Sequence, residues 1–199
     1  MMVLDIEASG VDYAEHSIVS MGALDFDNPT NQFYDECRIW DGANIDDEAL
    51  KIAGFTKKEA TEPAKRTKNE IVKAFISWSG DIPDHTFAGQ NVSFDRDFIK
   101  AACARGNIDY PFAHRALDTH SITYMHMLKR GVTPPFDKEK RRSALNITAA
   151  LKYCGIPDKR GDAHNALYDT YIHAELVSRL LYDKKLMPEF EAYEIPWKL

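Results

Sequence analysis

The sequence has no uninterrupted apolar run of about 18 or more residues, the length that indicates a membrane-spanning helix. Its first residues also lack the basic segment and the apolar segment that make up a secretory signal peptide. We therefore expect a soluble, cytoplasmic protein.

Cysteine and positive charge are also scarce. The three cysteines, Cys37, Cys103 and Cys154, are far apart and stand among apolar residues, which favours reduced thiols over a disulfide framework or a zinc site. The chain has 25 Lys and Arg and 31 Asp and Glu, which gives a net charge of −6. We therefore do not expect a basic surface that binds nucleic acid by general electrostatic attraction. A nucleic-acid enzyme whose bound metal ions neutralise the phosphates locally stays compatible with this charge.

No linker rich in Pro, Gly or Ser divides the chain, and its hydrophobic content of 44% suffices for one sizeable core. We therefore expect a single domain over residues 1–185. Residues 186–199 form a tail that is too apolar to float freely, because it contains Phe190, Tyr193, Ile195 and Trp197. We expect this tail to dock on the domain or on a partner.

Residue patterns predict an order of elements. Three apolar segments, 3–7, 18–26 and 32–40, predict an antiparallel meander of strands, with a turn over 27–31. A short helix is expected near 46–52, and 131–142 is expected to be a loop. The remaining elements are helix 67–79, strand 86–89, helix 93–105, strand 115–118, helix 119–130, a helix that Ser143 caps and Gly155 ends, and a last helix from about 162 to 182. This order predicts an α/β fold with a mixed five-stranded sheet flanked by helices.

Two carboxylates stand two residues apart on the first strand. Because successive side chains of a strand point to opposite faces, Asp5 and Glu7 share one face. A hard divalent cation such as Mg²⁺ would offset their charge. The same spacing at 46–48 and 137–139 lies in polar segments that we interpret as solvated loops, so the spacing alone does not define a site.

Further candidates follow along the chain. Asp95 lies where a strand meets helix 93–105, at an edge where functional sites of parallel sheets gather; the alternative is that it only favours the positive end of its helix. His164 and Asp169 are five residues apart, which on an ideal helix separates them by about 140°. We therefore expect His164 on a mobile approach, 161–163, or in the first turn, and Asp169 one turn further in. The alternative for both is an exposed surface position.

The motifs Asp5-x-Glu7, Asn91-x-x-Phe94-Asp95 and His164-x4-Asp169 resemble, in order and context, the three exonuclease motifs of the DEDDh family. These are DnaQ-like 3′→5′ exonucleases of the ribonuclease H-like superfamily, and the resemblance spans residues 2–182. Gln90 and Ala53 stand where that family often has His, which concerns substrate preference more than activity. The resemblance implies a ribonuclease H-like fold.

The resemblance also implies a reaction. Two divalent cations, Mg²⁺ or Mn²⁺, would support hydrolysis at the 3′ end of single-stranded DNA or RNA, releasing nucleoside 5′-monophosphates. Asp5 would bridge the ions, Glu7 and Asp169 would complete one metal site, and Asp95 would hold the other. His164 would take the proton from the attacking water.

Substrate contacts are implied for five residues: Ser9, Gly10, Phe55, Asn91 and Phe94. Phe55 would stack on a base. The basic run 138–142 is expected either to grip the nucleic-acid backbone or to be a solvated loop. A homodimer is plausible for the family. The choice between DNA and RNA depends on contacts to the 2′-OH, which motif spacing does not reveal.

Two alternatives stay open. One is a catalytically silent module of the same fold that binds nucleic acid or a protein partner. The other is a zinc site formed by His164, Asp169 and His173, which leaves Asp5, Glu7 and Asp95 unexplained. We interpret His173 more simply as a residue on the surface of the last helix.

Overall fold

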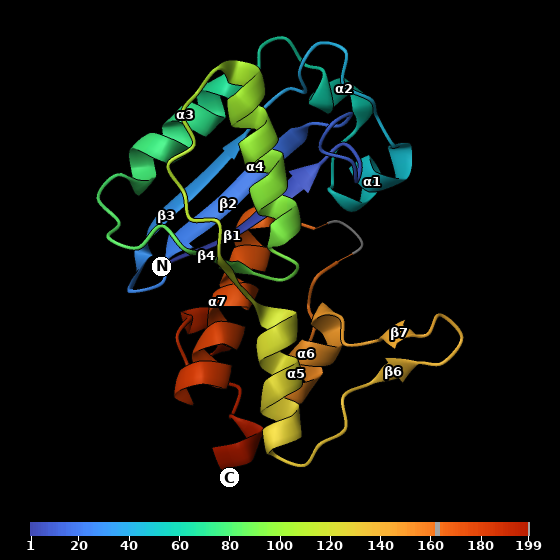
Figure 1. The fold of residues 1–199 in the computed structure, drawn as a ribbon, viewed down its shortest axis with the longest axis vertical. Coiled ribbons are helices and arrows are strands. Elements are labelled where there is room, and N and C mark those ends of the chain that lie inside the picture. Colours follow the sequence, from blue (N-terminus) through green and yellow to red (C-terminus); the bar gives the residue numbers. More distant parts are fainter. Residues whose placement is uncertain (162–163, 199) are drawn as a thin grey trace.

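The computed structural model describes residues 1–161 and 164–198 and contains a mixed sheet with the strand order β3-β2-β1-β4-β5 (Figure 1). The first three strands pair antiparallel, while β1 with β4 and β4 with β5 pair parallel. The strands are β1 (Met2–Ala8), β2 (Ile18–Asp25), β3 (Asn28–Glu36), β4 (Phe87–Gly89) and β5 (Ala116–Asp118). The predicted fold class, an antiparallel meander extended by parallel strands, is confirmed.

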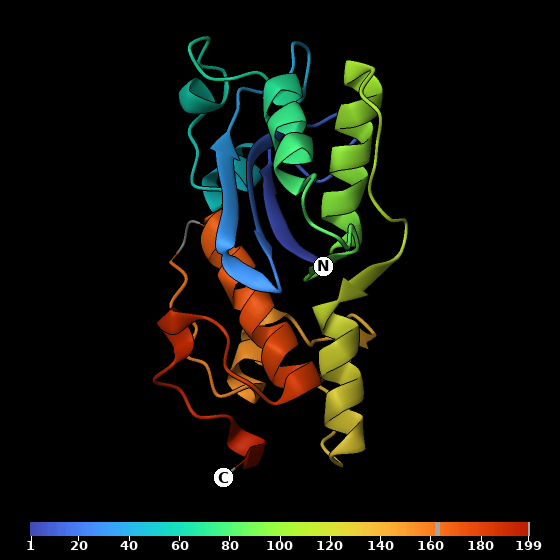
Figure 2. The same cartoon turned by 90° about the vertical axis from the view of Figure 1, so that its left-hand side faces the viewer.

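Helices cover both faces of this sheet. The helices are α1 (Asp47–Ile52), α2 (Lys57–Ala60), α3 (Lys68–Ser79), α4 (Ser93–Gly106), α5 (Thr119–Lys129), α6 (Ile147–Tyr153) and α7 (Ala166–Tyr182). Leu4 and Ile6 of β1 pack with α3 and α4 in one buried cluster, and Val3 packs with α7 and α6 in another. Figures 1 and 2 show the two groups of helices, with α5, α6 and α7 extending beyond the sheet. None of the described helices is both long and apolar enough to span a membrane.

The third strand begins earlier than predicted. The turn covers only Phe26 and Asp27, and β3 already pairs with β2 at Asn28 and ends at Glu36. Pro29 is tolerated because β3 is an edge strand, where a missing N–H costs no hydrogen bond of the sheet. The turn-forming residues of 28–31 therefore continue the strand.

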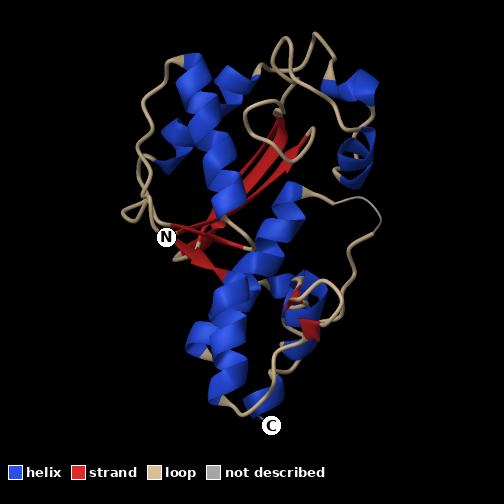
Figure 3. Cartoon of the chain, turned by 45° about the vertical axis from the view of Figure 1, so that its right-hand side comes forward, coloured by secondary structure: helices blue, strands red, loops and turns tan. Residues whose placement is uncertain are grey.

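The predicted loop 131–142 contains a small hairpin, β6 (Phe136–Asp137) with β7 (Arg142–Ser143), which lies apart from the main sheet (Figure 3). Ser143 belongs to this hairpin and does not cap a helix. The cap of α6 is Asn146, whose side chain accepts from the backbone N–H of Ala149. Asn and Ser are similar helix caps, so local sequence did not distinguish them.

Two other boundaries differ from the prediction. Helix α7 begins at Ala166 after its cap Asn165, whereas the sequence predicted a start near 162. Asp46, predicted to lie in a solvated loop, caps α1 by accepting from the backbone N–H groups of Glu48 and Ala49. Both differences arise because Asp and Asn side chains cap the first turn of a helix by accepting hydrogen bonds from its free backbone N–H groups.

The C-terminal residues pack against α7. Arg179, fully buried in that helix, donates to the carbonyl oxygens of Phe190 and Tyr193 at 3.1 and 2.8 Å. It also forms a buried ion pair with Glu175 at 2.6 Å. The segment includes two single-turn helices, η1 (Pro188–Phe190) and η2 (Pro196–Lys198). The buried Arg179 thus binds the backbone carbonyl groups of the C-terminal segment to the core of the protein.

Candidate active site

The site is built on β1. Asp5 and Glu7 alternate with Leu4 and Ile6 and face the α7 side of the sheet. The Asp5 side chain is 19% exposed and the Glu7 residue 8% exposed, so both carboxylates are largely removed from water. The strand geometry that the sequence predicted therefore holds, and the pair lies between the sheet and a helix.

Asp95 joins this pair from the first turn of α4. It is 3% exposed, and its Oδ1 accepts a hydrogen bond from the backbone N–H of Ile6 at 2.9 Å. Because Ile6 lies between Asp5 and Glu7, this hydrogen bond fixes the start of α4 beside both carboxylates. The role of Asp95 is therefore not limited to a favourable interaction with the positive end of its own helix.

Asp169 comes from the first turn of α7 and is 3% exposed. Gly22 of β2 lets this helix approach the sheet, because a Cβ at that position would collide with the backbone of Ala166. Both carboxylate oxygens of Asp169 are buried and have no hydrogen-bond partner within the described part of the chain. A buried carboxylate without donors costs free energy unless a cation binds it.

His164 precedes α7 and is held by its backbone N–H, which donates to the carbonyl oxygen of Ile52 at 2.7 Å. Its Nδ1 lies 3.8 Å from Asp169 Oδ2, and its side chain is 37% exposed. Ligand atoms of Glu7, His164 and Asp169 all lie within 4.8 Å of one another. Asp162 and Ala163, on the approach predicted to be mobile, lie outside the described residues.

The four carboxylates repel one another. Burial, followed by the charges of Asp95, Glu7 and Asp169, raises the pKa of Asp5 well above its usual value. Burial, followed by the charges of Asp169 and Asp95, raises the pKa of Glu7 to about 8, and burial raises that of Asp95 to about 7. The pKa of Asp169 is also raised by burial. Without a cation, protons bound to these carboxyl groups therefore offset part of the negative charge at neutral pH.

Arg160 is a contributor that the sequence did not single out. Its guanidinium group binds both carboxylate oxygens of Asp158, at 3.0 and 2.8 Å, and its Nη1 lies 3.7 Å from Asp169 Oδ1. It therefore offsets part of the charge of Asp169. The sequence around it is a polar loop without periodicity, so no local signal pointed to this role.

His173 is not a surface residue, contrary to the sequence interpretation. It is 3% exposed, its Nδ1 lies 4.0 Å from Asp5 Oδ1, and burial lowers its pKa to about 4. The group of possible metal ligands among the described residues contains Glu7 in place of His173. The zinc set of His164, Asp169 and His173 is therefore not the cluster that forms.

Two cavities adjoin the site. A cavity of about 260 Å³ is lined by His164, Asn165, Tyr34 and Phe55, and Lys65 Nζ lies 4.6 Å from the centre of the Phe55 ring. A larger cavity of about 730 Å³ is lined by residues that include Gln90, Asn91 and Asp118. Phe55 and Asn91 thus lie at cavities, as nucleotide contacts would require.

The other three predicted substrate residues are engaged within the protein. The Ser9 hydroxyl, which is fully buried, donates to the carbonyl oxygen of Asn44 at 2.8 Å and accepts from the N–H of Ser17. Gly10 packs against the ring of His16. The Phe94 ring packs on Phe98, with centroids 4.7 Å apart. Ser9 and Gly10 shape the loop after β1, and Phe94 lies in the first turn of α4; substrate contacts at these three residues stay a prediction.

A mixed sheet with four clustered carboxylates and a histidine at one end of its central strand defines a hydrolase of ribonuclease H-like fold that uses divalent metal ions. The comparison with known families agrees: the model of the RNase_T exonuclease family matches residues 2–177. The chain belongs to this family and is therefore an exonuclease.

Individual relatives are distant in sequence. Ribonuclease T of Yersinia pseudotuberculosis is 23% identical, over 90% of this chain and 83% of the relative. The fold is similar to that of E. coli exonuclease I in complex with a 5cy-dT13 oligonucleotide. The two structures superimpose over 92% of this chain with a TM-score of 0.71, at 18% sequence identity. This chain spans only 41% of that exonuclease. The nuclease domain of 3′hExo, a DEDDh family member bound to rAMP, gives a TM-score of 0.68 at 16% identity, over 93% of this chain and 96% of that chain.

Proposed function

We propose that this protein is a 3′→5′ exonuclease of single-stranded nucleic acid that requires Mg²⁺ or Mn²⁺ and releases nucleoside 5′-monophosphates. The observation that carries the proposal is the cluster of Asp5, Glu7, Asp95 and Asp169, in which burial raises every pKa and the neighbouring carboxylates raise those of Asp5 and Glu7 further. Such a cluster is stable in its ionised form only with bound cations.

The donor set fits hard divalent cations. Four carboxylates supply oxygen ligands, which Mg²⁺ and Mn²⁺ prefer, and both oxygens of Asp169 lack protein donors. When bound, a pair of such cations would activate water on one side of the scissile phosphate and stabilise the leaving oxygen on the other. Asp5, at the centre of the cluster, is the residue that we assign to both ions.

His164 is placed to move a proton. Its ring lies beside Glu7 and Asp169, on the border of the 260 Å³ cavity, and about a third of it is exposed to solvent. Histidine suits general base catalysis near neutral pH. Its Nδ1 lies 3.8 Å from Asp169 Oδ2, and we assign His164 the proton of the attacking water.

The smaller cavity suits the terminal nucleotide. Phe55 offers an aromatic ring on which a base can stack when Lys65, which lies over the ring and is ion-paired with Glu36 at 2.6 Å, moves aside. The rAMP bound to the nuclease domain of 3′hExo, which shares this fold, is a nucleoside monophosphate of the kind that we propose as product. This support extends to both RNA and DNA, because exonuclease I is bound to a DNA strand.

Digestion of 5′-labelled oligonucleotides tests the direction of cleavage. We expect a DNA or RNA strand with a free 3′ hydroxyl to shorten one nucleotide at a time, while its 3′-phosphorylated counterpart stays intact. Mass spectrometry should identify nucleoside 5′-monophosphates as the product. Equal digestion of the two strands, or internal cleavage, would contradict the proposal.

A catalytically silent module is the alternative from the sequence, and it predicts binding of oligonucleotides without any release of monophosphate. The same digestion therefore separates the two functions. A homodimeric state and a cytoplasmic location remain predictions, and sedimentation at two protein concentrations tests the first.

A further inference from the structure

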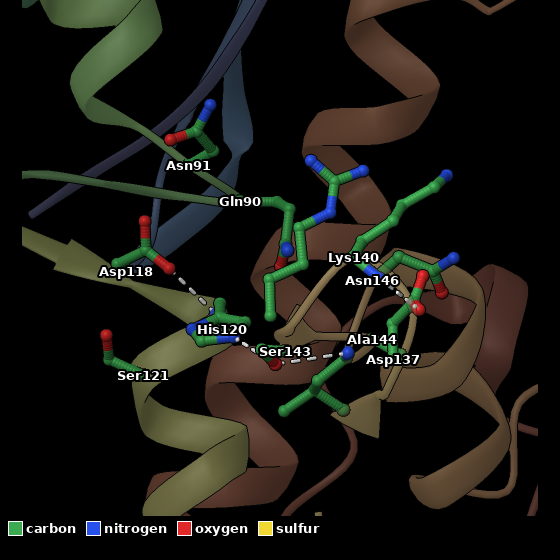
Figure 4. A pocket seen from close by; sticks show the side chains of 12 residues that line it. Gln90, Asn91, Asp118, His120, Ser121, Asp137, Lys140, Ser143, Ala144 and Asn146 are labelled. Carbon is green, nitrogen blue, oxygen red and sulfur yellow. Dashed lines mark hydrogen bonds between the residues drawn. The ribbon is translucent and has the colours of Figure 1, made fainter. Parts of the chain in front are cut away.

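The larger cavity has two chemically different walls. One wall carries Gln90 and Asn91, which follow β4, and Asp118 at the end of β5. The opposite wall is the hairpin β6–β7, which presents Lys140 and Arg142. Figure 4 shows Lys140 across the cavity from Gln90, Asn91 and Asp118. The cavity thus runs from the neighbourhood of the carboxylates to a basic hairpin.

Hydrogen bonds hold the hairpin in this position. Ser143 Oγ lies 2.9 Å from Nε2 of His120, in the first turn of α5, as Figure 4 also shows. The carboxylate of Asp137 accepts from the backbone N–H groups of Glu139 and Lys140 and closes the turn. Leu145, which is 3% exposed, anchors the chain directly after the hairpin. The basic wall is therefore fixed before any ligand binds.

The positive charges on this wall are available to a ligand. Within residues 1–161 and 164–198, no carboxylate lies within ion-pair distance of Lys140 or Arg142. The cavity also contains Asp118 and Asp137, but both carboxylates accept backbone N–H groups at the start of α5 and in the hairpin turn. In a chain of net charge −6, the run 138–142 places four cations among five residues beside the cavity.

We propose that this cavity receives the nucleotides on the 5′ side of the cleaved bond, and that Lys140 and Arg142 contact their phosphates. The inference rests on the proposed exonuclease function. The smaller cavity is lined by His164, and the larger one by Asn91, which lies just before α4, the helix that carries Asp95. The smaller one has room for one nucleotide, so the continuing strand occupies the larger and more basic one.

The size of the cavity sets the expected dependence on strand length. We expect a dinucleotide to have no phosphate that reaches the hairpin and a strand of about five or more nucleotides to have one, since single-strand binding sites typically span about 4–16 nucleotides. In the wild type, affinity should therefore increase with length and then level off.

The test is a comparison of KM for a dinucleotide and for a 10-nucleotide strand. We expect Lys140→Ala/Arg142→Ala to raise KM for the longer strand by about tenfold and to change kcat little, since both groups act in binding. The effect on the dinucleotide should be less than about twofold. In binding titrations, loss of two phosphate contacts should flatten the slope of log K against log salt by about 1.4 units.

Lys73→Ala/Lys184→Ala is the matched control, because it removes the same charge from two exposed positions outside both cavities. A wild-type protein without nuclease activity in Mg²⁺ or Mn²⁺ would overturn the proposed function. An active wild type whose hairpin variant keeps the KM, the length dependence and the salt slope of the control would overturn only the present inference. Lys140→Glu/Arg142→Glu should weaken binding of the longer strand further than the alanine variant does.

Discussion

At the scale of single residues, the fold buries four carboxyl groups close together, although burial and repulsion between like charges both disfavour their ionised forms. Asp169 shows this most clearly, because its two buried oxygens have no hydrogen-bond partner in the described residues, among which Arg160 is the one permanent cation within ion-pair distance. Proteins keep such groups where a ligand satisfies them. The unsatisfied carboxylate therefore identifies the site independently of any sequence motif.

The first prediction concerns Asp5→Asn. Activity should fall by several orders of magnitude, because the carboxylate assigned to both ions is lost. The metal-free protein should gain roughly 1–3 kcal/mol in free energy of unfolding at pH 8, since repulsion from Glu7 and Asp95 is relieved. Urea denaturation and digestion assays check both parts, with the exposed Asp81→Asn as control. Near-wild-type turnover would remove Asp5 from the mechanism.

The second prediction separates a general base from a metal ligand. His164→Ala should lower turnover by about 100- to 10,000-fold and leave Mn²⁺ affinity nearly unchanged. Asp169→Ala should lose both turnover and metal binding. Calorimetric titration of the two variants with Mn²⁺, side by side, provides the measurement. If His164→Ala binds metal as poorly as Asp169→Ala, His164 is a ligand.

At the scale of elements, the sequence was most informative where local chemistry defines a boundary. The helix predicted over 67–79 is observed as α3, which starts at a capping box formed by Thr67 and Glu70. The hairpin β6–β7 could not be predicted in this way, because its two-residue strands carry no alternating pattern. The close approach of α7 to β2 at Gly22 is a tertiary contact that no local sequence encodes.

The third prediction tests this contact. Gly22→Ala should lower the free energy of unfolding by about 1–3 kcal/mol, because the added methyl group meets the backbone of Ala166 and pushes α7 from the sheet. Metal affinity should fall as well, since Asp169 moves with the helix. Gly80→Ala, at a position with helical dihedral angles, is the control. Unchanged stability and unchanged Mn²⁺ binding would show that the close approach is not required.

At the scale of the whole molecule, order and spacing of the motifs were enough to predict the fold class and the carboxylate cluster. They could not predict Arg160 or the burial of His173, because both depend on how loops and helices pack around the finished sheet. They also could not predict the hydrogen bonds of the Ser9 hydroxyl, since its partners, Asn44 and Ser17, lie in other segments of the chain.

The fourth prediction is a stability that decreases with pH in the metal-free protein. Glu7 has a folded pKa of about 8 and Asp95 of about 7, both above their usual values, so the folded chain holds more protons than the unfolded chain. The free energy of unfolding should therefore fall as pH rises from about 6.5 to 8. His173, whose pKa is lowered to about 4, acts in the opposite direction only below about pH 6.5.

Urea denaturation at several pH values, with and without Mn²⁺, checks this prediction. Saturating Mn²⁺ should stabilise the protein more at pH 8 than at pH 6.5, because ionised carboxylates bind the cation and protonated ones do not. A metal-free stability that rises over this pH range would show that the carboxylates are not destabilising one another.

The central claim is that the carboxylate cluster holds the divalent cations on which exonuclease activity depends. Its most direct test is to strip the protein of metal, mix it with a 5′-labelled single-stranded oligonucleotide, and follow product length as Mn²⁺ or Mg²⁺ is added back. The account predicts no cleavage before addition and a ladder that shortens from the 3′ end afterwards, with Asp5→Asn inactive throughout. Complete digestion in excess EDTA, or a ladder of equal rate from Asp5→Asn, would contradict it.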